Sequence, residues 1–384
     1  MIPGPRRRFN ERFTPALYAA FLDRLAAKCG EAVPFRVCET PCFLPADLLA
    51  RMTACGEELL AQLDPTYLAA SDAALPAAYA VPNQAPHPLF VQADFGLVRG
   101  ADGALEPKLV EIQGFPSLYA FQPAVAKTYI ESYGIELAPS PGYEELFRQA
   151  VLGRHAPEET ILMEIDPAHQ KTRPDFVLTG KMLGVRAVCV TKIRKRGSRL
   201  YYDRDGVETP VRRIYNRTIV DELERKGITP PFDWRDELDV EWAGHPNWYF
   251  RLSKFTIPHL KHECVPETWF LDRLAEIPPD PENYVLKPLY SFAGRGVIVG
   301  PTRGEIEAVP ADRRADYVLQ RRMRFEPVID TPHGPTQAEI RIMYIRIDKP
   351  VAVSTLVRMG RGKMMGVDHN RDLEWVGASA GLVA

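Results

Sequence analysis

The most constraining feature of the sequence is a segment from residue 284 to residue 301, in which a lysine-bearing strand, a loop of small residues and a second strand follow one another. Gly294 and Gly296 have no side chains that would block a phosphate, and their backbone N–H groups can point at it. Lys287, on the first strand, can offset the charge of such a group. Because Gly-x-Gly alone often marks an ordinary turn, the segment predicts a nucleotide site only together with other elements.

Length and charge limit the kind of protein that this sequence describes. A chain of 384 residues can bury a large core, and we expect two or three lobes. Its net charge of −2 does not favour nucleic acid or a membrane as the main partner. No apolar run reaches the ~18 residues of a membrane span, and the basic start lacks the apolar stretch of a secretory signal. The expected location is the cytoplasm.

The cysteines form no obvious metal motif in the sequence. They lie at positions 29, 38, 42, 55, 189 and 264. Cys38, Cys42 and Cys55 are close to one another, but no CxxC pair and no nearby histidine completes a zinc pattern. The sequence therefore predicts reduced thiols.

Hydrophobic spacing indicates how the chain is organised. Apolar residues at three- and four-residue spacing predict helices within residues 14–62 and over residues 122–133. Apolar runs on both sides of the turn Gly100–Gly103 predict a hairpin. From residue 159, a strand, a helix over Arg173–Leu183 and a strand over Val185–Thr191 favour a parallel sheet. Further strands are expected over residues 317–321, 338–347 and 351–359.

The predicted hairpin carries acidic residues that can hold a metal ion. Asp94 lies on its first strand, and Glu111 and Gln113 lie two residues apart on its second, so they share one face. Oxygen ligands on one face suit Mg²⁺, particularly when phosphates complete its coordination. Glu111 also interrupts an apolar run, where an unpaired carboxylate is costly. An ordinary solvent-facing strand is the alternative.

The strands of the last third carry further candidate residues. Residues 317–323 form an apolar strand with a polar end, which can offer backbone groups to an adenine ring or can be a plain core strand. Arg341 and Arg358 lie within apolar strands, where a guanidinium needs an anion. A triphosphate is one candidate, and an internal carboxylate such as Glu339 is the other.

Together these elements resemble the ATP-grasp superfamily. That family usually presents a lysine, a lysine strand with a glycine loop, a hinge strand for adenine, arginine-bearing strands, and last an Asp and a Glu-x-Asn for magnesium. The matching residues are Lys254, Lys287, the loop with Ser291, Gly294 and Gly296, the hinge with Gln320, Arg321 and Met323, and then Arg341, Arg358 and Asn370. The resemblance implies that they bind ATP, with Lys287, Arg341 and Arg358 acting in catalysis.

The order of these elements resembles a circular permutation. No Glu-x-Asn follows Asn370, and Asp94, Glu111 and Gln113 supply the magnesium residues upstream. This resembles the permuted ATP-grasp branch that includes glutathionylspermidine synthetase, whose metal motif precedes a stretch like 116–119 and whose strand–helix–strand lobe ends in paired arginines. The resemblance implies substrate contacts from Ser117, Tyr119, Arg212, Arg213 and Arg217.

Several alternatives stay open within this resemblance. The arginines can instead pair with Asp221, Glu222 or Glu224, and Ser117 and Tyr119 can simply end the strand. Gln113 stands where the family usually has Asn, with one more methylene. No amidase segment accompanies the ligase-like part.

The expected fold class is mixed α+β and α/β: a circularly permuted ATP-grasp fold with a Rossmann-like strand–helix–strand lobe and an N-terminal helical segment. We divide the chain into a mainly helical segment (1–88), a metal-binding hairpin (89–125), a substrate lobe (126–246) and a nucleotide-binding region (247–384).

The resemblance implies an ATP- and Mg²⁺-dependent carboxylate–amine ligase that forms an acyl phosphate and then an amide. Its partners would be a small-molecule or peptide carboxylate and an amine, with no nucleic acid and no membrane. A protein of this fold that binds ATP without catalysis is one alternative, and a small-molecule kinase is another.

Overall fold

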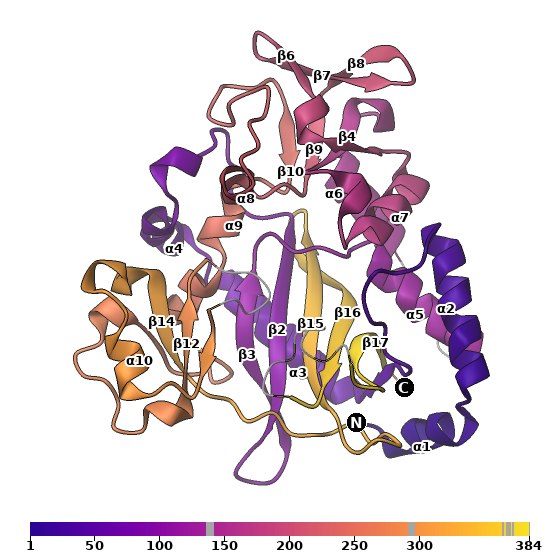
Figure 1. Cartoon of the computed structure of the whole chain (residues 1–384), viewed down its shortest axis with the longest axis vertical. Coiled ribbons are helices and arrows are strands. Elements are labelled where there is room, and N and C mark those ends of the chain that lie inside the picture. The colour runs from indigo at the N-terminus through magenta and orange to yellow at the C-terminus, as the bar shows by residue number, and fades with distance from the viewer. Residues whose placement is uncertain (136–141, 291–295, 363–364, 366–369, 371, 384) are drawn as a thin grey trace.

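A computed structural model describes residues 1–135, 142–290, 296–362, 365, 370 and 372–383 (Figure 1). At its centre is a six-stranded sheet with the order β1-β17-β16-β15-β2-β3. All neighbours are antiparallel except β1 and β17. The bounds are β1 Cys42–Leu44, β2 Phe90–Arg99, β3 Leu105–Gln113, β15 Gln337–Arg346, β16 Pro350–Gly360 and β17 Gly377–Val383. The sheet thus joins the first third of the chain to the last.

Alternation along β2 separates the two faces of this sheet. Val91 and Phe95 lie in the apolar core on one face. Gln92 and Asp94, although fully buried, point to the opposite face, where Arg341 of β15 contacts both. The alternation of side chains along β2 therefore places the buried Asp94 carboxylate on the face of the sheet that carries Arg341.

A β-bulge on β3 places Glu111 on that same side. Asp94 pairs with Glu111 and Phe95 pairs with Leu109, which leaves Val110 as an extra residue. Because of this extra residue, Leu109 enters the apolar core together with Ile112 while Glu111 faces Asp94. The bulge explains how a carboxylate sits within an apolar run.

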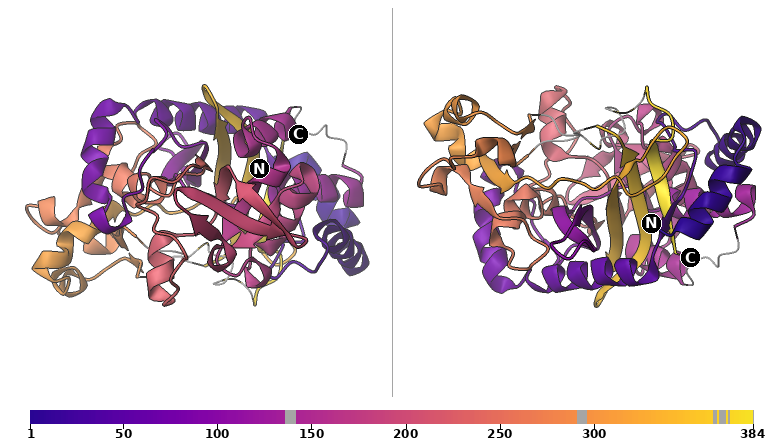
Figure 2. Two further views of the ribbon diagram at one scale, coloured as in Figure 1. Left: turned by 90° about the horizontal axis from the view of Figure 1, so that it is seen from above. Right: turned by 90° about the horizontal axis from the view of Figure 1, so that it is seen from below.

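Helices cover both faces of the central sheet, as Figure 2 shows from above and below. Helix α3 (Ala46–Ala61) packs on the face formed by β3, β15 and β16. Helix α5 (Phe121–Tyr133) packs on the other face against β16 and β17, and α2 (Pro15–Cys29) packs on α5. Two short helices complete the N-terminal region, α1 (Pro3–Arg12) and α4 (Pro65–Ala70).

A second, parallel sheet has the order β10-β9-β4-β5 and lies at the top of Figure 1. Its strands are β4 Thr160–Glu164, β5 Arg186–Cys189, β9 Arg213–Asn216 and β10 Glu241–Ala243, with helices α6 Tyr143–Leu152, α7 Arg173–Leu183 and α8 Val220–Arg225. A three-stranded antiparallel arm projects from it, formed by β6 Arg194–Arg196, β7 Arg199–Arg204 and β8 Val207–Val211.

A third sheet, with the order β11-β14-β12-β13, forms the lobe at the lower left of Figure 1. Its strands are β11 Thr268–Phe270, β12 Tyr284–Pro288, β13 Ile298–Val299 and β14 Tyr317–Arg321, flanked by helix α10 Arg303–Glu307. Helix α9 (Trp248–Arg251) and the 3-10 helix Lys254–His259 lead into this lobe.

The sequence predicts the long elements well and the short ones poorly. The hairpin, α5 and the strand–helix–strand unit all form where they are expected. The prediction of helix throughout residues 14–62 is wrong at Cys42–Leu44, because this segment pairs with Gly381–Val383 of β17. Among the described residues, no helix is long and apolar enough to span a membrane.

Candidate active site

A cavity of about 1090 Å³ lies where the three large sheets meet. β3, β15 and β16 form one wall, and β12, β13 and β14 form another. The third wall comes from the end of β4 and from the chain after β9. Charged residues that line it are Glu111, Glu164, Lys171, Arg217, Glu222, Lys254, Lys287, Arg321, Arg322, Arg324, Glu339, Arg341, Arg358 and Arg361.

Carboxylates and arginines alternate on the central-sheet wall. Arg341 Nη2 lies 2.8 Å from Asp94 Oδ2, 3.5 Å from Glu339 Oε1 and 4.0 Å from Glu111 Oε1. Arg358 Nη1 lies 3.1 Å from Glu339 Oε1. The antiparallel pairing explains this cluster, because Arg341 is opposite Asp94 and Glu339 is opposite Arg358.

Two lysines approach the same carboxylates from other elements. Lys254 Nζ, at the start of the 3-10 helix, lies 3.8 Å from Glu111 Oε2. Lys287 Nζ, on β12, donates to Gln320 Oε1 and lies 3.4 Å from the Val110 carbonyl oxygen of the bulge. Val110 and Lys287 are 177 residues apart in the sequence. The fold thus brings the hairpin and the lysine strand to the same place.

Burial and neighbouring charges change the acidities in this cluster. Burial raises the pKa of Asp94 to about 8, although Arg341 opposes the shift. Burial also acts to raise the pKa of Glu111, but Lys254, Arg341 and Lys287 together lower it. Burial lowers the pKa of Lys287 to about 8, against the pull of Glu111. Perturbed groups that share a cavity are typical of functional sites.

The acidic residues fit a magnesium ion with one adjustment. Asp94 Oδ1 is buried and has no hydrogen-bond partner among the described residues, which leaves a carboxylate oxygen available. Gln113 currently turns its amide nitrogen to the carboxylates, at 2.9 Å from Asp94 Oδ2 and 2.8 Å from Glu111 Oε1. A cation held by all three would need the amide rotated, so that Oε1 faces the ion.

The β12–β14 wall has features that suit a nucleotide. Gln320 Nε2 is buried without a partner among the described residues, next to Lys287. Met323 lines the cavity, and so does Arg321, which also bonds to Asp280 and Tyr284. Apolar residues on this wall include Val285, Leu289 and Val299.

The glycine loop is described only at its end. Ser291 and Gly294 lie outside the described residues. Gly296 has φ +73°, and a Cβ there would lie 3.2 Å from Pro288 Cγ. Both features favour glycine at this position. Asn370 is buried beside Gly360, the last residue of β16, and its Oδ1 accepts a hydrogen bond from the Arg361 backbone N–H at 3.2 Å.

The residues predicted to bind substrate divide into two groups. Ser117 and Arg217 line the cavity. Arg217 donates to the Pro116 carbonyl oxygen, and its guanidinium carbon lies 4.8 Å from the centre of the Phe115 ring. The structure therefore places both residues where a bound molecule can reach them.

Tyr119, Arg212 and Arg213 do not line the cavity, so nothing in the geometry supports the substrate contacts predicted for them. Tyr119 is fully buried and donates to the Val91 and Tyr344 carbonyl oxygens, so it fixes the sheet. Arg212 and Arg213 form ion pairs of 2.7 Å with Asp239 and 2.9 Å with Glu241, because β9 lies beside β10. The partners expected from the sequence, Asp221, Glu222 and Glu224, were also wrong.

The sequence interpretation missed Glu164 as a cavity residue. It ends β4, and burial raises the pKa of its carboxyl to about 7. Its position had a signal, because side chains at the carboxyl ends of parallel strands commonly face a ligand. Glu339 was weighed only as an ion-pair partner, yet it also lines the cavity.

No protein-family model matches this sequence, and no curated protein matches it either. Among solved structures, the chain is similar to a glutathione synthetase-like effector from Globodera pallida in its apo form. The TM-score is 0.58 at 11% identity, and the match covers 97% of this chain and 99% of that one. At this identity the likeness is one of fold. The chain therefore has a fold similar to that of this glutathione synthetase-like protein.

Proposed function

We propose that this protein is an ATP- and Mg²⁺-dependent carboxylate–amine ligase with a circularly permuted ATP-grasp arrangement. The observation that carries the proposal is that Glu111 of the hairpin, Arg341, Lys254 and Lys287 meet around one cavity. Asp94 of the same hairpin is fully buried and does not line the cavity, but it lies 2.8 Å from Arg341 Nη2. In the permuted order the hairpin comes first in the chain but pairs with β15, so the site keeps its parts.

The charges of the cavity suit a triphosphate with its cation. When all groups are ionised, Lys254, Lys287, Arg341 and Arg358 carry four positive charges, against three negative charges on Asp94, Glu111 and Glu339. Magnesium, when bound, would supply further positive charge to the phosphates. Asp94 and Glu111, with Gln113 after rotation of its amide, would hold it.

The chain's own residues mainly bind and orient in this reaction. A substrate carboxylate oxygen attacks the γ-phosphorus of ATP, the bond to the β–γ bridging oxygen breaks, and ADP leaves. An amine then attacks the acyl carbon, phosphate leaves, and the amine loses a proton. Lys287, Lys254 and Arg341 would orient the phosphates and stabilise the charge that develops on them.

The far end of the cavity would take the substrates. Arg217 can bind a carboxylate, and Ser117 lies beside it. Glu164 lines the same end and, once ionised, can bind an ammonium group. A molecule with both a carboxylate and an amine fits this pair, which is why we favour amino acids and peptides as substrates. A polyamine fits as the amine substrate, because its ammonium group can pair with Glu164.

A second candidate is an ATP-binding protein of this fold without ligase activity. The amide nitrogen of Gln113 faces both carboxylates, where a cation would lie, and this arrangement favours it. Such a protein would bind ATP but release no ADP in response to substrates. A kinase, in turn, would leave a stable phosphorylated product.

The test is an ADP-release screen over amino acids, peptides and polyamines, with products identified by mass. We expect ADP, phosphate and an amide with a matching pair of substrates. Lys287→Ala should reduce the rate at least 100-fold with an unchanged circular dichroism spectrum. Lys192→Ala, at an exposed lysine just before the three-stranded arm and outside the cavity lining, should leave the rate of ADP release unchanged. ATP binding without any product would support the second candidate instead.

A further inference from the structure

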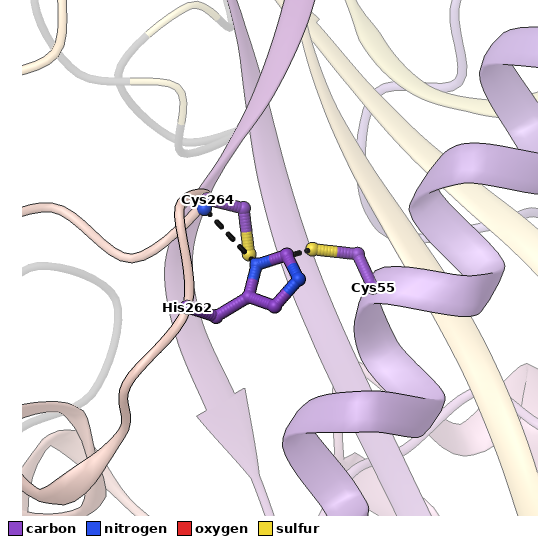
Figure 3. A group of neighbouring side chains, drawn as sticks. All are labelled: Cys55, His262 and Cys264. Carbon is purple, nitrogen blue, oxygen red and sulfur yellow. Dashed lines mark hydrogen bonds between the residues drawn. The ribbon is translucent and has the colours of Figure 1, made fainter.

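Outside the cavity, three potential metal ligands meet on the far side of β3. Cys55 lies on α3, and His262 and Cys264 lie on the segment between the 3-10 helix and β11 (Figure 3). Their ligand atoms all lie within 4.8 Å of one another. This cluster of ligands could not be predicted from local sequence spacing, because Cys55 and His262 are 207 residues apart.

Hydrogen bonds fix the orientation of the His262 ring. Nε2 lies 3.0 Å from Glu58 Oε2. An ionised carboxylate accepts hydrogen bonds and cannot donate one, so Nε2 is the donor. Nδ1 accepts from the Cys264 backbone N–H at 3.1 Å and faces Cys55 Sγ at 3.4 Å. The ring is therefore the tautomer with its proton on Nε2, and Nδ1 is the ring nitrogen next to the two cysteines. A carboxylate behind a histidine is the usual support of a metal-binding imidazole.

The segment that carries His262 and Cys264 is held in place by its neighbours. Gln62, at the end of α3, exchanges two hydrogen bonds with the Lys261 backbone, of 3.1 and 2.9 Å. Leu109 N–H of β3 donates to the Cys264 carbonyl oxygen at 2.7 Å. The two cysteines are also 6% and 3% exposed. The ligand atoms are thus preorganised rather than brought together by chance contact of mobile loops.

We propose that Cys55, His262 and Cys264 form a binding site for a divalent metal that prefers sulfur and nitrogen, of which Zn²⁺ is the best fit. Tetrahedral zinc with bonds of ~2.3 Å to sulfur and ~2.0 Å to nitrogen places its ligands roughly 3.5–3.8 Å apart. The 3.4 Å between Cys55 Sγ and His262 Nδ1 is close to that spacing. The site supplies three of four ligands, and the fourth position takes water.

The charge balance of the site also suits such an ion. Two thiolates and a neutral imidazole carry two negative charges, which a divalent ion neutralises, so no net charge is buried. Because zinc binds thiolates and not thiols, metal binding at this site releases protons.

A bound ion would join two elements that contact β3, a strand of the candidate active site. It would tie α3, which packs under the central sheet, to the segment that follows the Lys254–His259 helix. That segment also contacts β3, the strand of Glu111. We assign the ion a structural role, because Cys55, His262 and Cys264 do not line the cavity.

The test uses the full chain, fully reduced and freed of metal, titrated with Co²⁺ and then Zn²⁺. We expect one Co²⁺ per chain, with the thiolate charge-transfer and tetrahedral d–d absorption bands, and displacement of the cobalt by one Zn²⁺. Zinc should also raise the melting temperature. Neither readout depends on ATP or on ligase activity, so the outcome is independent of the proposed function.

Variants separate the site from other thiols. Cys55→Ser, Cys264→Ser and His262→Asn should each weaken zinc binding at least 100-fold, and Glu58→Gln by roughly tenfold. Cys189→Ser, a half-exposed cysteine on β5, is the matched control and should bind zinc normally. Without metal, the wild type and these variants should have the same melting temperature. Cobalt bound without thiolate bands, zinc binding unchanged in Cys55→Ser, or a Cys55–Cys264 disulfide formed in place of the metal would each overturn the proposal.

Discussion

Asp94 is fully buried beside Arg341, and its Oδ1 has no partner among the described residues. A purely structural ion pair would satisfy both oxygens, because an unpaired buried carboxylate oxygen costs about 1–3 kcal/mol. Glu111 shares Arg341 with Asp94 and also faces Lys254. This arrangement supports the proposed ligand site better than a purely structural ion pair.

Glu111→Gln should weaken the magnesium requirement. The amide keeps the shape of the side chain but removes a negative charge from the cation site, so we expect the Mg²⁺ concentration for half-maximal ADP release to rise at least tenfold. Glu106→Gln is the matched control, on the same strand but paired with Lys108 away from the cavity. An unchanged magnesium titration in Glu111→Gln would show that the hairpin does not hold the metal.

Glu164 predicts a pH-dependent contribution to folding. Burial raises its pKa from 4.5 to about 7. The folded protein thus holds a proton that the unfolded chain loses, so the contribution is fully present below pH 4.5 and is lost as pH rises through 7. From pH 5 to pH 8, the free energy of unfolding of the wild type should fall by ~3 kcal/mol more than that of Glu164→Gln. Denaturant titrations measure this difference. Glu158→Gln, an exposed neighbour, should behave as wild type.

Individual site residues were predictable where a charge interrupts an apolar strand. Glu111, Arg341 and Lys287 stand out in this way, because a buried charge needs a partner. Arg213 gives the same signal, yet it serves the contact between β9 and α6, where it bonds to Glu241 and to two carbonyl oxygens. The sequence shows that a buried charge has a partner but not which one.

The bulge on β3 connects two walls of the cavity. It turns Glu111 to the cavity and leaves the Val110 carbonyl oxygen near Lys287 Nζ, at 3.4 Å. Just beyond it, Gly114 N–H donates to the Leu252 carbonyl oxygen at 2.9 Å. That contact positions the chain that begins the Lys254 helix, so one strand end aligns both lysines with the carboxylates.

Gly114→Ala should disturb this alignment. A Cβ there would lie 2.6 Å from Leu252 Cβ and 2.7 Å from the Trp248 carbonyl oxygen, so the backbone of α9 must shift. We expect a loss of about 1–3 kcal/mol in unfolding free energy and weaker ATP binding, because Lys254 moves from Glu111. Calorimetry measures both. Gly304→Ala, in helix α10 with no atom near the new Cβ, should be neutral or stabilising. Equal effects of the two substitutions would contradict the argument.

Short elements escaped prediction for a physical reason. β1 and β10 have three residues each, and β17 is rich in small residues, so none has a periodic pattern of its own. They form because longer strands beside them need partners, as β17 does for β16. By contrast, β15 and β16 are long and largely apolar, and their predicted bounds are within one residue of the observed ones.

Across the molecule, the candidate site is assembled from all three large sheets. A ligand that touches each wall stabilises the folded chain in proportion to its concentration. The three-stranded arm β6–β8 projects away from the cavity and contributes no residue to it. The arm therefore serves as an internal reference for ligand effects.

ATP with Mg²⁺ should protect the cavity walls from amide hydrogen exchange. We expect slower exchange in β3, β12, β14 and the Lys254–His259 helix, because bound nucleotide links the lobe of the third sheet to the central sheet. Exchange in β7 and β8 should not change. Protection confined to one wall would mean that the nucleotide does not bridge the sheets.

The pairing of early strands with late ones sets the order in which this chain can fold during synthesis. β1, β2 and β3 are complete once residue 113 has been synthesised. Their partners β15 and β17 begin only at residues 337 and 377. At 5–20 residues per second, the apolar strand β2 waits roughly ten to fifty seconds with an unpaired edge. Nascent chains should therefore depend on chaperones that shield β2, and the nucleotide site should appear only when translation is nearly complete.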